Sequence, residues 1–201
     1  MTHHVAVIDY GMGNLHSVAS AMEHVGATKV TVSHKPKEIA AADRVVFPGV
    51  GGIRDCMEAI RRLGCDKLLD DVLNRAGKPV LAICVGMQAL MTRSEENEGV
   101  ACLDTVQGDV RYFGDAHCDE TGTRLKVPHM GWNTVEPAID HPLWQGIKPG
   151  ERFYYVHSYH VVPADQKIVA GTFEYGLTGC AALARENIFG TQFHPEKSHR
   201  A

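Results

Sequence analysis

The chain has 201 residues, six cysteines and a formal net charge of −4. This length is typical of one domain with a sizeable core, and we expect a single domain over residues 1–201. The small acidic excess offers no electrostatic basis for binding nucleic acid, and no apolar run approaches the roughly 18 residues that a membrane span needs. We therefore expect no nucleic-acid partner and no membrane partner.

The first half of the chain alternates short apolar segments with helical segments. Strands are predicted at residues 4–8, 29–33, 44–47 and 80–83, and helices at residues 15–25, 35–42, 53–63, 65–76 and from Val85 onward. Such alternation predicts a parallel sheet with right-handed crossovers. A glycine-rich turn follows the first strand, but the third glycine of a dinucleotide fingerprint is absent, so no nucleotide cofactor is expected.

The second half of the chain has a different pattern. The segments 106–113, 153–157, 159–162, 168–173, 180–184 and 188–193 read as strands or extended chain, and little helix is expected, including at residues 123–127. Residues 115–122 are polar and fit a hairpin or an exposed loop. The sequence therefore predicts an α/β fold in which antiparallel or mixed strands are added to a parallel core.

The cysteines and histidines are scattered and predict neither a disulfide framework nor a metal site. The sequence contains no CxxC and no helical pair of histidines, so reduced thiols in a cytoplasmic protein are the better interpretation. The start of the chain lacks the pattern of a signal peptide, because a strand follows His3 and His4 directly.

The stretch from Lys78 to Met91 has the form of a nucleophile elbow. A branched apolar strand is followed by Cys84, and Gly86 leaves room where a helix begins. We expect this tight turn to expose the sulfur and the helix N-terminus to favour the thiolate. By itself the pattern also fits an inert cysteine at the end of a buried strand.

The far end of the chain supplies the groups that a reactive cysteine needs. An apolar strand delivers His194, and Glu196 lies two residues further along. A thiol nucleophile requires a base, and the base requires an acceptor that fixes its tautomer. A triad of Cys84, His194 and Glu196 therefore explains both segments better than a strand-terminal histidine beside a surface glutamate.

Over residues 5–198 these motifs resemble the class I (triad) glutamine amidotransferases. PGVG (48–51), CVGMQ (84–88) and HPE (194–196) are typical of the whole family. DYGMGNL (9–15), PHMGWN (128–133) and FYYVHSYH (153–160) are similar to the glutaminase subunits of imidazole glycerol phosphate synthase. The resemblance implies a flavodoxin-like fold, with a mostly parallel central sheet flanked by helices and added antiparallel strands, and no cofactor.

The resemblance also implies a reaction and a partner. Cys84 would attack the carboxamide of glutamine, His194 would protonate the leaving ammonia and activate water, and Glu196 would orient the imidazole. The ammonia would pass to a (β/α)₈ cyclase subunit within a heterodimer. That subunit would convert PRFAR to imidazole glycerol phosphate and AICAR in histidine biosynthesis.

Further site residues are implied by the same resemblance. The backbone N–H groups of Val50 and Val85 match the donors of an oxyanion hole. Positions that match substrate contacts are Gly51, Gln88, Glu96, Ser158 and Tyr159, and positions near the partner are Asn14, Trp132, Tyr154 and Lys197. Taken alone, Glu96 also fits a solvated loop, and Trp132 and Tyr154 also fit ordinary packing.

Two other interpretations remain at this point. A glutaminase subunit that serves pyridoxal phosphate or purine synthesis would keep the chemistry, but PHMGWN and FYYVHSYH argue against it. A catalytically silent binding or metal-storing protein of the same fold would have no need of the complete triad.

Overall fold

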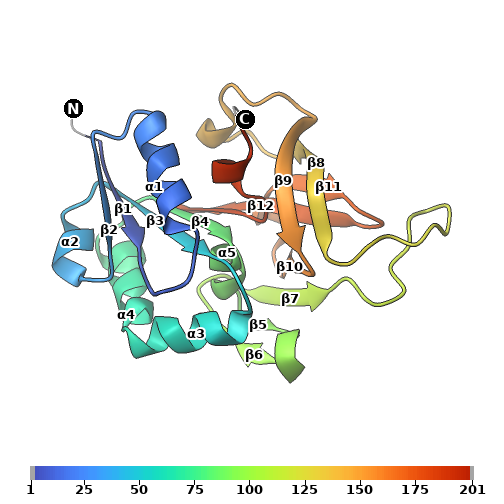
Figure 1. Ribbon diagram of the computed structural model, residues 1–201, viewed down its shortest axis with the longest axis horizontal. Coiled ribbons are helices and arrows are strands. Elements are labelled where there is room, and N and C mark those ends of the chain that lie inside the picture. Colours follow the sequence, from blue (N-terminus) through green and yellow to red (C-terminus); the bar gives the residue numbers. More distant parts are fainter. Residues whose placement is uncertain (1–2, 200–201) are drawn as a thin grey trace.

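The computed structural model describes residues 3–199, and a nine-stranded sheet forms its centre (Figure 1). Five parallel strands lie in the order β2 (Lys29–Ser33), β1 (His4–Ile8), β3 (Arg44–Gly49), β4 (Val80–Cys84) and β13 (Ile188–Thr191). The sheet continues, with each strand antiparallel to its neighbours, through β12 (Thr178–Arg185), β11 (Val169–Glu174), β8 (His129–Pro137) and β9 (Glu151–His157). The predicted α/β fold, a parallel core with added antiparallel strands, is confirmed.

Helices occur mainly in the first half of the chain. They are α1 (Leu15–His24), α2 (Pro36–Ala40), α3 (Ile53–Arg62), α4 (Cys65–Asp70), which continues into a π-helical turn (Asp71–Arg75), and α5 (Val85–Ala89). Short 3₁₀ helices follow at Glu96–Glu98, Pro142–Trp144, Gln166–Ile168 and, as η5, Pro195–Lys197. Among the residues described, no helix has the length and apolar character needed to cross a bilayer.

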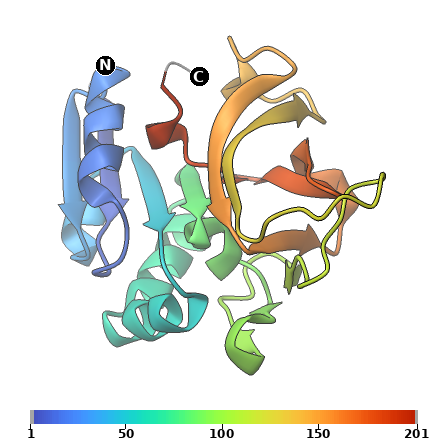
Figure 2. The same ribbon diagram turned by 45° about the vertical axis from the view of Figure 1, so that its right-hand side comes forward.

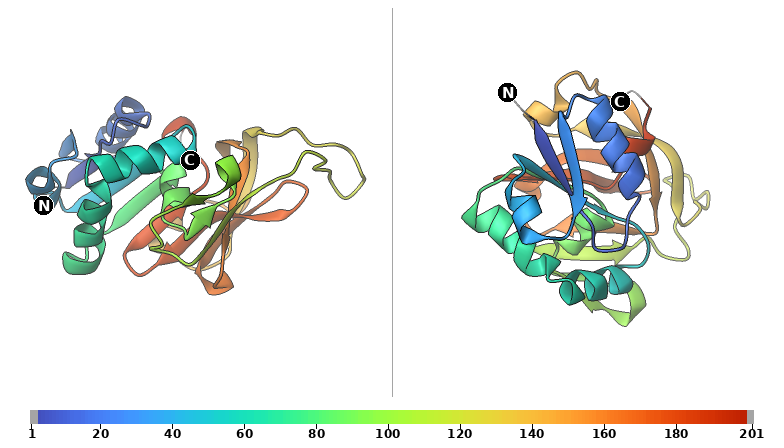
Figure 3. Two further views of the ribbon diagram at one scale, coloured as in Figure 1. Left: turned by 90° about the horizontal axis from the view of Figure 1, so that it is seen from below. Right: turned by 60° about the vertical axis from the view of Figure 1, so that its left-hand side comes forward.

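A second, smaller sheet lies beside the first. It contains four strands in the order β10 (Tyr159–Pro163), β7 (Gly108–Tyr112), β5 (Arg93–Ser94) and β6 (Val100–Ala101). Between β7 and β8 the chain forms a long loop that projects from the body of the molecule (Figure 3). The loop turns where the carboxylate of Asp119 accepts hydrogen bonds from the backbone of Thr121 and Thr123, so the predicted hairpin or exposed loop is present.

Besides the short strands β5 and β6, which were not predicted, three longer parts of the structure differ from the sequence-based prediction. Strand β8 was not predicted, because only some of its side chains are buried and Gly131 interrupts the apolar alternation. The predicted helix over residues 65–76 divides at Asp70 into α4 and the π-helical turn. The helix that begins at Val85 ends at Ala89, because the chain turns there toward β5.

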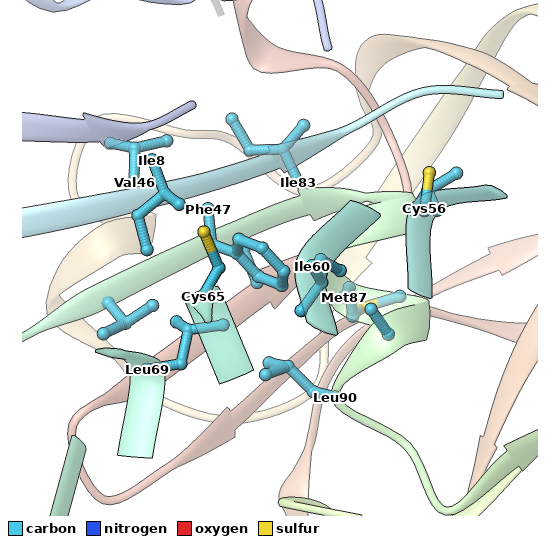
Figure 4. Close-up of a cluster of buried hydrophobic side chains, with 14 of the residues drawn as sticks. Ile8, Val46, Phe47, Cys56, Ile60, Cys65, Leu69, Ile83, Met87 and Leu90 are labelled. Atoms are coloured by element: carbon cyan, nitrogen blue, oxygen red, sulfur yellow. The ribbon is translucent and has the colours of Figure 1, made fainter. Parts of the chain in front are cut away.

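Two clusters of buried apolar side chains stabilise the fold. The larger cluster packs α3, α4 and α5 against the parallel strands, and Figure 4 shows Phe47 lying among Ile60 and Leu69 of this cluster. The smaller cluster lies against the antiparallel strands. Leu81 of β4 packs against both clusters, and strands β12 and β13 contribute buried side chains to each of them. Burial of each large apolar side chain contributes roughly 1.5–3 kcal/mol before entropy is counted.

The approach of β3 to the start of α5 leaves no room for side chains. A Cβ atom at Gly86 would clash with the carbonyl oxygen of Phe47, and one at Gly49 would lie 2.6 Å from the backbone nitrogen of Gly86. Glycine at these two positions therefore allows the end of β3 and the elbow after β4 to lie in direct backbone contact.

We predict that Gly86→Ala lowers the free energy of unfolding by about 3 kcal/mol, because backbone atoms would have to separate to admit the methyl group. Gly64→Ala is the matched control: Gly64 has open space around it, and only its positive φ of 69° opposes a side chain. The control substitution should lower the free energy of unfolding by about 1 kcal/mol. Urea denaturation of both variants measures the difference, and equal losses would contradict the close approach described above.

The smaller cluster also encloses histidines. His129 and His157 are buried, and Nδ1 of His129 lies 2.9 Å from Nε2 of His157. Burial, aided by the charge of His117, lowers the pKa of His129 to about 4. Burial likewise lowers the pKa of His157 to about 3. Both imidazoles are therefore neutral at pH 7.

The neutral histidines predict a loss of stability in mild acid. An unfolded histidine binds a proton near pH 6.5, whereas these two bind it only near pH 4 and pH 3 in the folded protein. Their contribution is complete above pH 6.5 and is lost as the pH falls. The free energy of unfolding should thus decrease by up to about 2.7 kcal/mol per pH unit near pH 5 from this pair. In His129→Gln the slope of the free energy of unfolding against pH, measured between pH 6.5 and pH 5, should be smaller by about half of that amount. An unchanged slope would contradict the neutral state assigned to His129.

Candidate active site

The backbone places Cys84 at the turn between β4 and α5. Its φ and ψ angles are 52° and −112°, a conformation that non-glycine residues rarely adopt. Such backbone strain occurs at functional sites and is the feature of a nucleophile elbow. The expectation that the turn exposes the sulfur is wrong: Cys84 is only 3% exposed, because β4 ends between β3 and β13.

His194 and Glu196 follow β13, the strand beside β4. Nδ1 of His194 lies 2.8 Å from Oε1 of Glu196, and both side chains are almost fully buried. Burial alone would lower the pKa of His194, but the Cys84 thiol and the Glu196 carboxylate together raise it to about 9. The structure thus brings the three predicted triad residues together, with a protonated imidazole at pH 7.

The loop that carries His194 is fixed by strand β9. The backbone N–H of His194 donates to the carbonyl of Tyr154, at 2.9 Å. The hydroxyl of Ser198 accepts from the N–H of Tyr154, at 3.0 Å, and donates to the carbonyl of His194, at 2.6 Å. Ser198 was not singled out from the sequence, because no local sequence pattern marks a serine that links two backbone groups.

The segment 48–51 lies at the end of β3, where Gly49 pairs with Cys84 across the parallel ladder. The hydroxyl of Tyr10 donates to the carbonyl of Pro48, at 2.8 Å, and the thiol of Cys56 donates to the carbonyl of Val50, at 3.4 Å. Val85 is the first residue of α5. The two predicted oxyanion positions, Val50 and Val85, therefore flank Cys84.

Gln88 is buried in the interior beside Cys84, as its position one helical turn later predicts. Its amide Nε2 donates to the carbonyl of Tyr159, at 3.0 Å, and to Oε1 of Gln192, at 3.2 Å. The carbonyl of Ser158 accepts from the N–H of Phe113. The carbonyls of Ser158 and Tyr159 are thus engaged within the protein, and a carboxylate there would need backbone N–H donors.

The carboxylate of Glu96 lies at the start of α3 rather than free in solvent. Its Oε2 accepts from the N–H of Ile53, at 3.2 Å, and its carboxylate lies beside Gly52. Gly51, with a φ of 94°, forms the turn that joins this helix to the end of β3. Glu96 and Gly51 are therefore connected through the first residues of α3.

Gln192 is a further site residue that the sequence analysis missed. Its side chain is fully buried, and its Nε2 lies 3.7 Å from Sγ of Cys84. The available signal was strand periodicity, because Gln192 and His194 are two residues apart and so can project from the same face.

The predicted partner residues lie on two neighbouring parts of the surface. Trp132 of β8 and Tyr154 of β9 are cross-strand partners with ring centroids 6.1 Å apart, and Trp132 is 38% exposed. Asn14 precedes α1 and Lys197 lies in η5, two elements that pack together (Figure 2). Within residues 3–199 no group of three His, Cys, Asp or Glu side chains is arranged to hold a metal ion.

Comparison with solved structures agrees with this architecture. A putative GMP synthase component from Thermoplasma acidophilum matches 99% of this chain and 87% of its own, with a TM-score of 0.70 and 19% identity. PurLQS from Thermotoga maritima matches 98% of this chain and 89% of its own, with a TM-score of 0.66 and 17% identity. Similarity to structures of such low sequence identity shows a shared fold and nothing more.

Comparison of sequences is more specific. The model of the family "Glutamine amidotransferase class-I" matches residues 6–201. Imidazole glycerol phosphate synthase subunit HisH of Pseudomonas syringae is 58% identical over 97% of this chain and 91% of its own. The corresponding subunit of Acinetobacter baylyi is 54% identical over 98% of this chain and 92% of its own. The chain therefore belongs to the class I glutamine amidotransferases, in the branch of the HisH subunits.

Proposed function

We propose that this chain is the glutaminase subunit of an imidazole glycerol phosphate synthase and that Cys84, His194 and Glu196 form its catalytic triad. The observation that supports this most is the convergence of the strained Cys84 turn and the buried His194–Glu196 pair at adjacent strand ends. Identity of 58% to HisH relatives favours this synthase over those of pyridoxal phosphate or purine synthesis.

The chemistry follows from the charges of the triad. With its pKa raised to about 9, His194 holds a proton at pH 7 and stabilises negative charge on the neighbouring sulfur. In the proposed reaction the sulfur attacks the carboxamide carbon as a thiolate. Collapse of the tetrahedral intermediate forms a thioester and breaks the C–N bond, and His194 gives its proton to the leaving ammonia. The imidazole then takes a proton from water as the water oxygen attacks the thioester carbon. The C–S bond breaks, the sulfur leaves as thiolate and glutamate is released, while Glu196 holds the ring in one tautomer.

The oxyanion of this intermediate requires fixed N–H donors, and Val50 and Val85 are suited to supply them. Hydrogen bonds from Tyr10 and Cys56 hold the carbonyls of Pro48 and Val50, which leaves the peptide between Gly49 and Val50 as the part that can rotate. We expect its N–H to turn toward the sulfur only when the acceptor is bound to the partner. One such donor changes turnover by roughly 10²–10³-fold.

Recognition of glutamine involves the groups around this centre. In this proposal Glu96 holds the amino group, backbone N–H groups near Ser158 and Tyr159 hold the carboxylate, and Gly51 is a further substrate contact. Gln88 contributes to the pocket, although its buried amide is already bound to Tyr159 and Gln192.

Ammonia released in the cytoplasm is useful only if it reaches the cyclase subunit, so a partner must cover the site. The exposed Trp132 and the half-buried Tyr154 form an aromatic pair suited to anchor that partner, and Asn14 and Lys197 extend the same interface. Because the carbonyl of Tyr154 accepts from the N–H of His194, a shift of β9 on binding would reach the catalytic imidazole through one hydrogen bond.

We predict that Cys84→Ser reduces glutamine hydrolysis by about 10⁴-fold or more, because the attacking thiolate is lost. Synthesis from added ammonia by the assembled complex should be unaffected, since that step belongs to the cyclase. Glutamate release and product formation measure the two activities. Cys118→Ser, in the projecting loop, is the matched control and should retain both; a Cys84→Ser protein that still hydrolyses glutamine would remove the central claim.

For the interface, Trp132→Ala should weaken binding of the cyclase subunit by about 30-fold, a loss typical of a central aromatic anchor. The melting temperature of the isolated chain should change little, because Trp132 is 38% exposed. Calorimetric titration measures the affinity. Val25→Ala, an exposed apolar residue at the opposite end of α1 from Asn14, should bind normally, and equal affinities for both variants would place the interface elsewhere.

A further inference from the structure

A continuous chain of buried hydrogen bonds connects strand β10 to the sulfur of Cys84. The carbonyl of Tyr159 accepts from Nε2 of Gln88, at 3.0 Å, and the same Nε2 donates to Oε1 of Gln192, at 3.2 Å. Nε2 of Gln192 lies 3.7 Å from Sγ of Cys84. Gln88 is 3% exposed and Gln192 is fully buried.

The chemistry of these groups fixes the direction of the chain. A backbone carbonyl can only accept, so the atom of Gln88 that faces Tyr159 is its amide nitrogen. The second hydrogen of that nitrogen requires an acceptor, which is the amide oxygen of Gln192. The nitrogen of Gln192 is therefore the atom that faces Cys84, and it donates to the sulfur. A negatively charged sulfur is a better acceptor than a neutral thiol.

The carbonyl at the start of the chain is held from its other side by histidines. Nδ1 of His157 lies 2.8 Å from the carbonyl of Tyr159 and must carry the proton. Nε2 of His157 is then an acceptor for Nδ1 of His129, at 2.9 Å, and Nε2 of His129 accepts from Asn133, at 3.2 Å. In this series of hydrogen bonds every donor points toward Tyr159. The arrangement requires both imidazoles to be neutral, and their burial keeps them neutral.

We propose that Gln192 is a further catalytic residue, whose amide donates to Sγ of Cys84 and stabilises the thiolate in its attacking orientation, and that Gln88 is the positioning residue that orients it. This inference rests on the proposed function of Cys84 as the nucleophile. The donor acts whenever the sulfur is negative: before attack, and again when the thioester is hydrolysed and the sulfur leaves as thiolate.

Gln192 and His194 have different roles at the sulfur of Cys84. His194 interacts with Cys84 and exchanges protons with the substrate, so its charge changes during the reaction. The amide of Gln192 is neutral throughout and keeps its orientation because Gln88 and Tyr159 hold it. A fixed, neutral donor stabilises the thiolate without competing for the proton that ammonia needs.

The test is the rate at which Cys84 is alkylated by iodoacetamide in the assembled complex, measured by mass spectrometry of the peptide. Gln192→Met removes the donor at similar volume, and it should slow alkylation and kcat by about 10–100-fold, the range for a hydrogen bond to a charged group. KM should change much less, because the substrate is held by other residues. Cys118, half-buried and distant in sequence, gives an internal reference in the same sample.

Gln192→Glu separates hydrogen bonding from packing. The glutamate has the same shape, but its carboxylate cannot donate and adds a negative charge beside the sulfur, so this variant should be slower than Gln192→Met. A role in packing alone predicts the reverse order, with the isosteric variant nearer to the wild type. Gln145→Met, at an exposed position, is the control and should match the wild type.

Besides the reverse order of the two Gln192 variants, two further outcomes would overturn the inference. One is alkylation of Cys84 at the wild-type rate in both Gln192 variants. The other is a loss of rate that follows the melting temperature of each variant instead of its capacity to donate. Failure of the proposed function gives a different result. Cys84→Ser would then hydrolyse glutamine at the same rate as the wild type, whatever residue stands at position 192.

Discussion

The direct contact between the end of β3 and the turn after β4 is the constraint on which the site depends. Backbone meets backbone there, since neither Gly49 nor Gly86 has space for a Cβ atom. This contact sets Val50 beside Cys84, while β13 places His194 on the other side of β4. The carboxyl ends of three adjacent parallel strands thus bring together the proposed oxyanion segment, the proposed nucleophile and the proposed base, at the side of the sheet where α/β folds bind their ligands.

The antiparallel strands extend this site rather than forming a separate unit beside it. β9 carries Tyr154, which contributes its ring to the aromatic pair with Trp132 and its backbone to the hydrogen bonds with His194 and Ser198. β10 carries the Tyr159 carbonyl, to which Gln88 is bound. The proposed partner surface and the proposed catalytic groups are therefore joined through the backbones of two short segments.

Buried histidines take opposite charge states within this one protein. His194 has a carboxylate and a thiol beside it, and these more than offset the effect of burial, so its pKa rises to about 9. At His157 burial dominates, and the neighbouring His129, His160 and His194 lower the pKa further, so it falls to about 3. The proton on His194 contributes stability that is complete below pH 6.5 and is lost as the pH rises toward 9. The neutrality of His157 has the reverse dependence, which favours the folded state most near neutral pH.

The sequence by itself determined the alternating elements of the parallel core, the elbow at Cys84 and the pairing of His194 with Glu196, because these depend on residues close together in the chain. It did not determine strand β8, whose half-exposed face has no clear period, or the burial of the Cys84 sulfur, which strands from both halves of the chain enclose. Only the tertiary structure connected Gln88 to Tyr159 and Gln192, which lie 71 and 104 positions further along the chain. Hydrogen bonds between such distant residues form when β10, β13 and α5 pack together, and no local pattern predicts them.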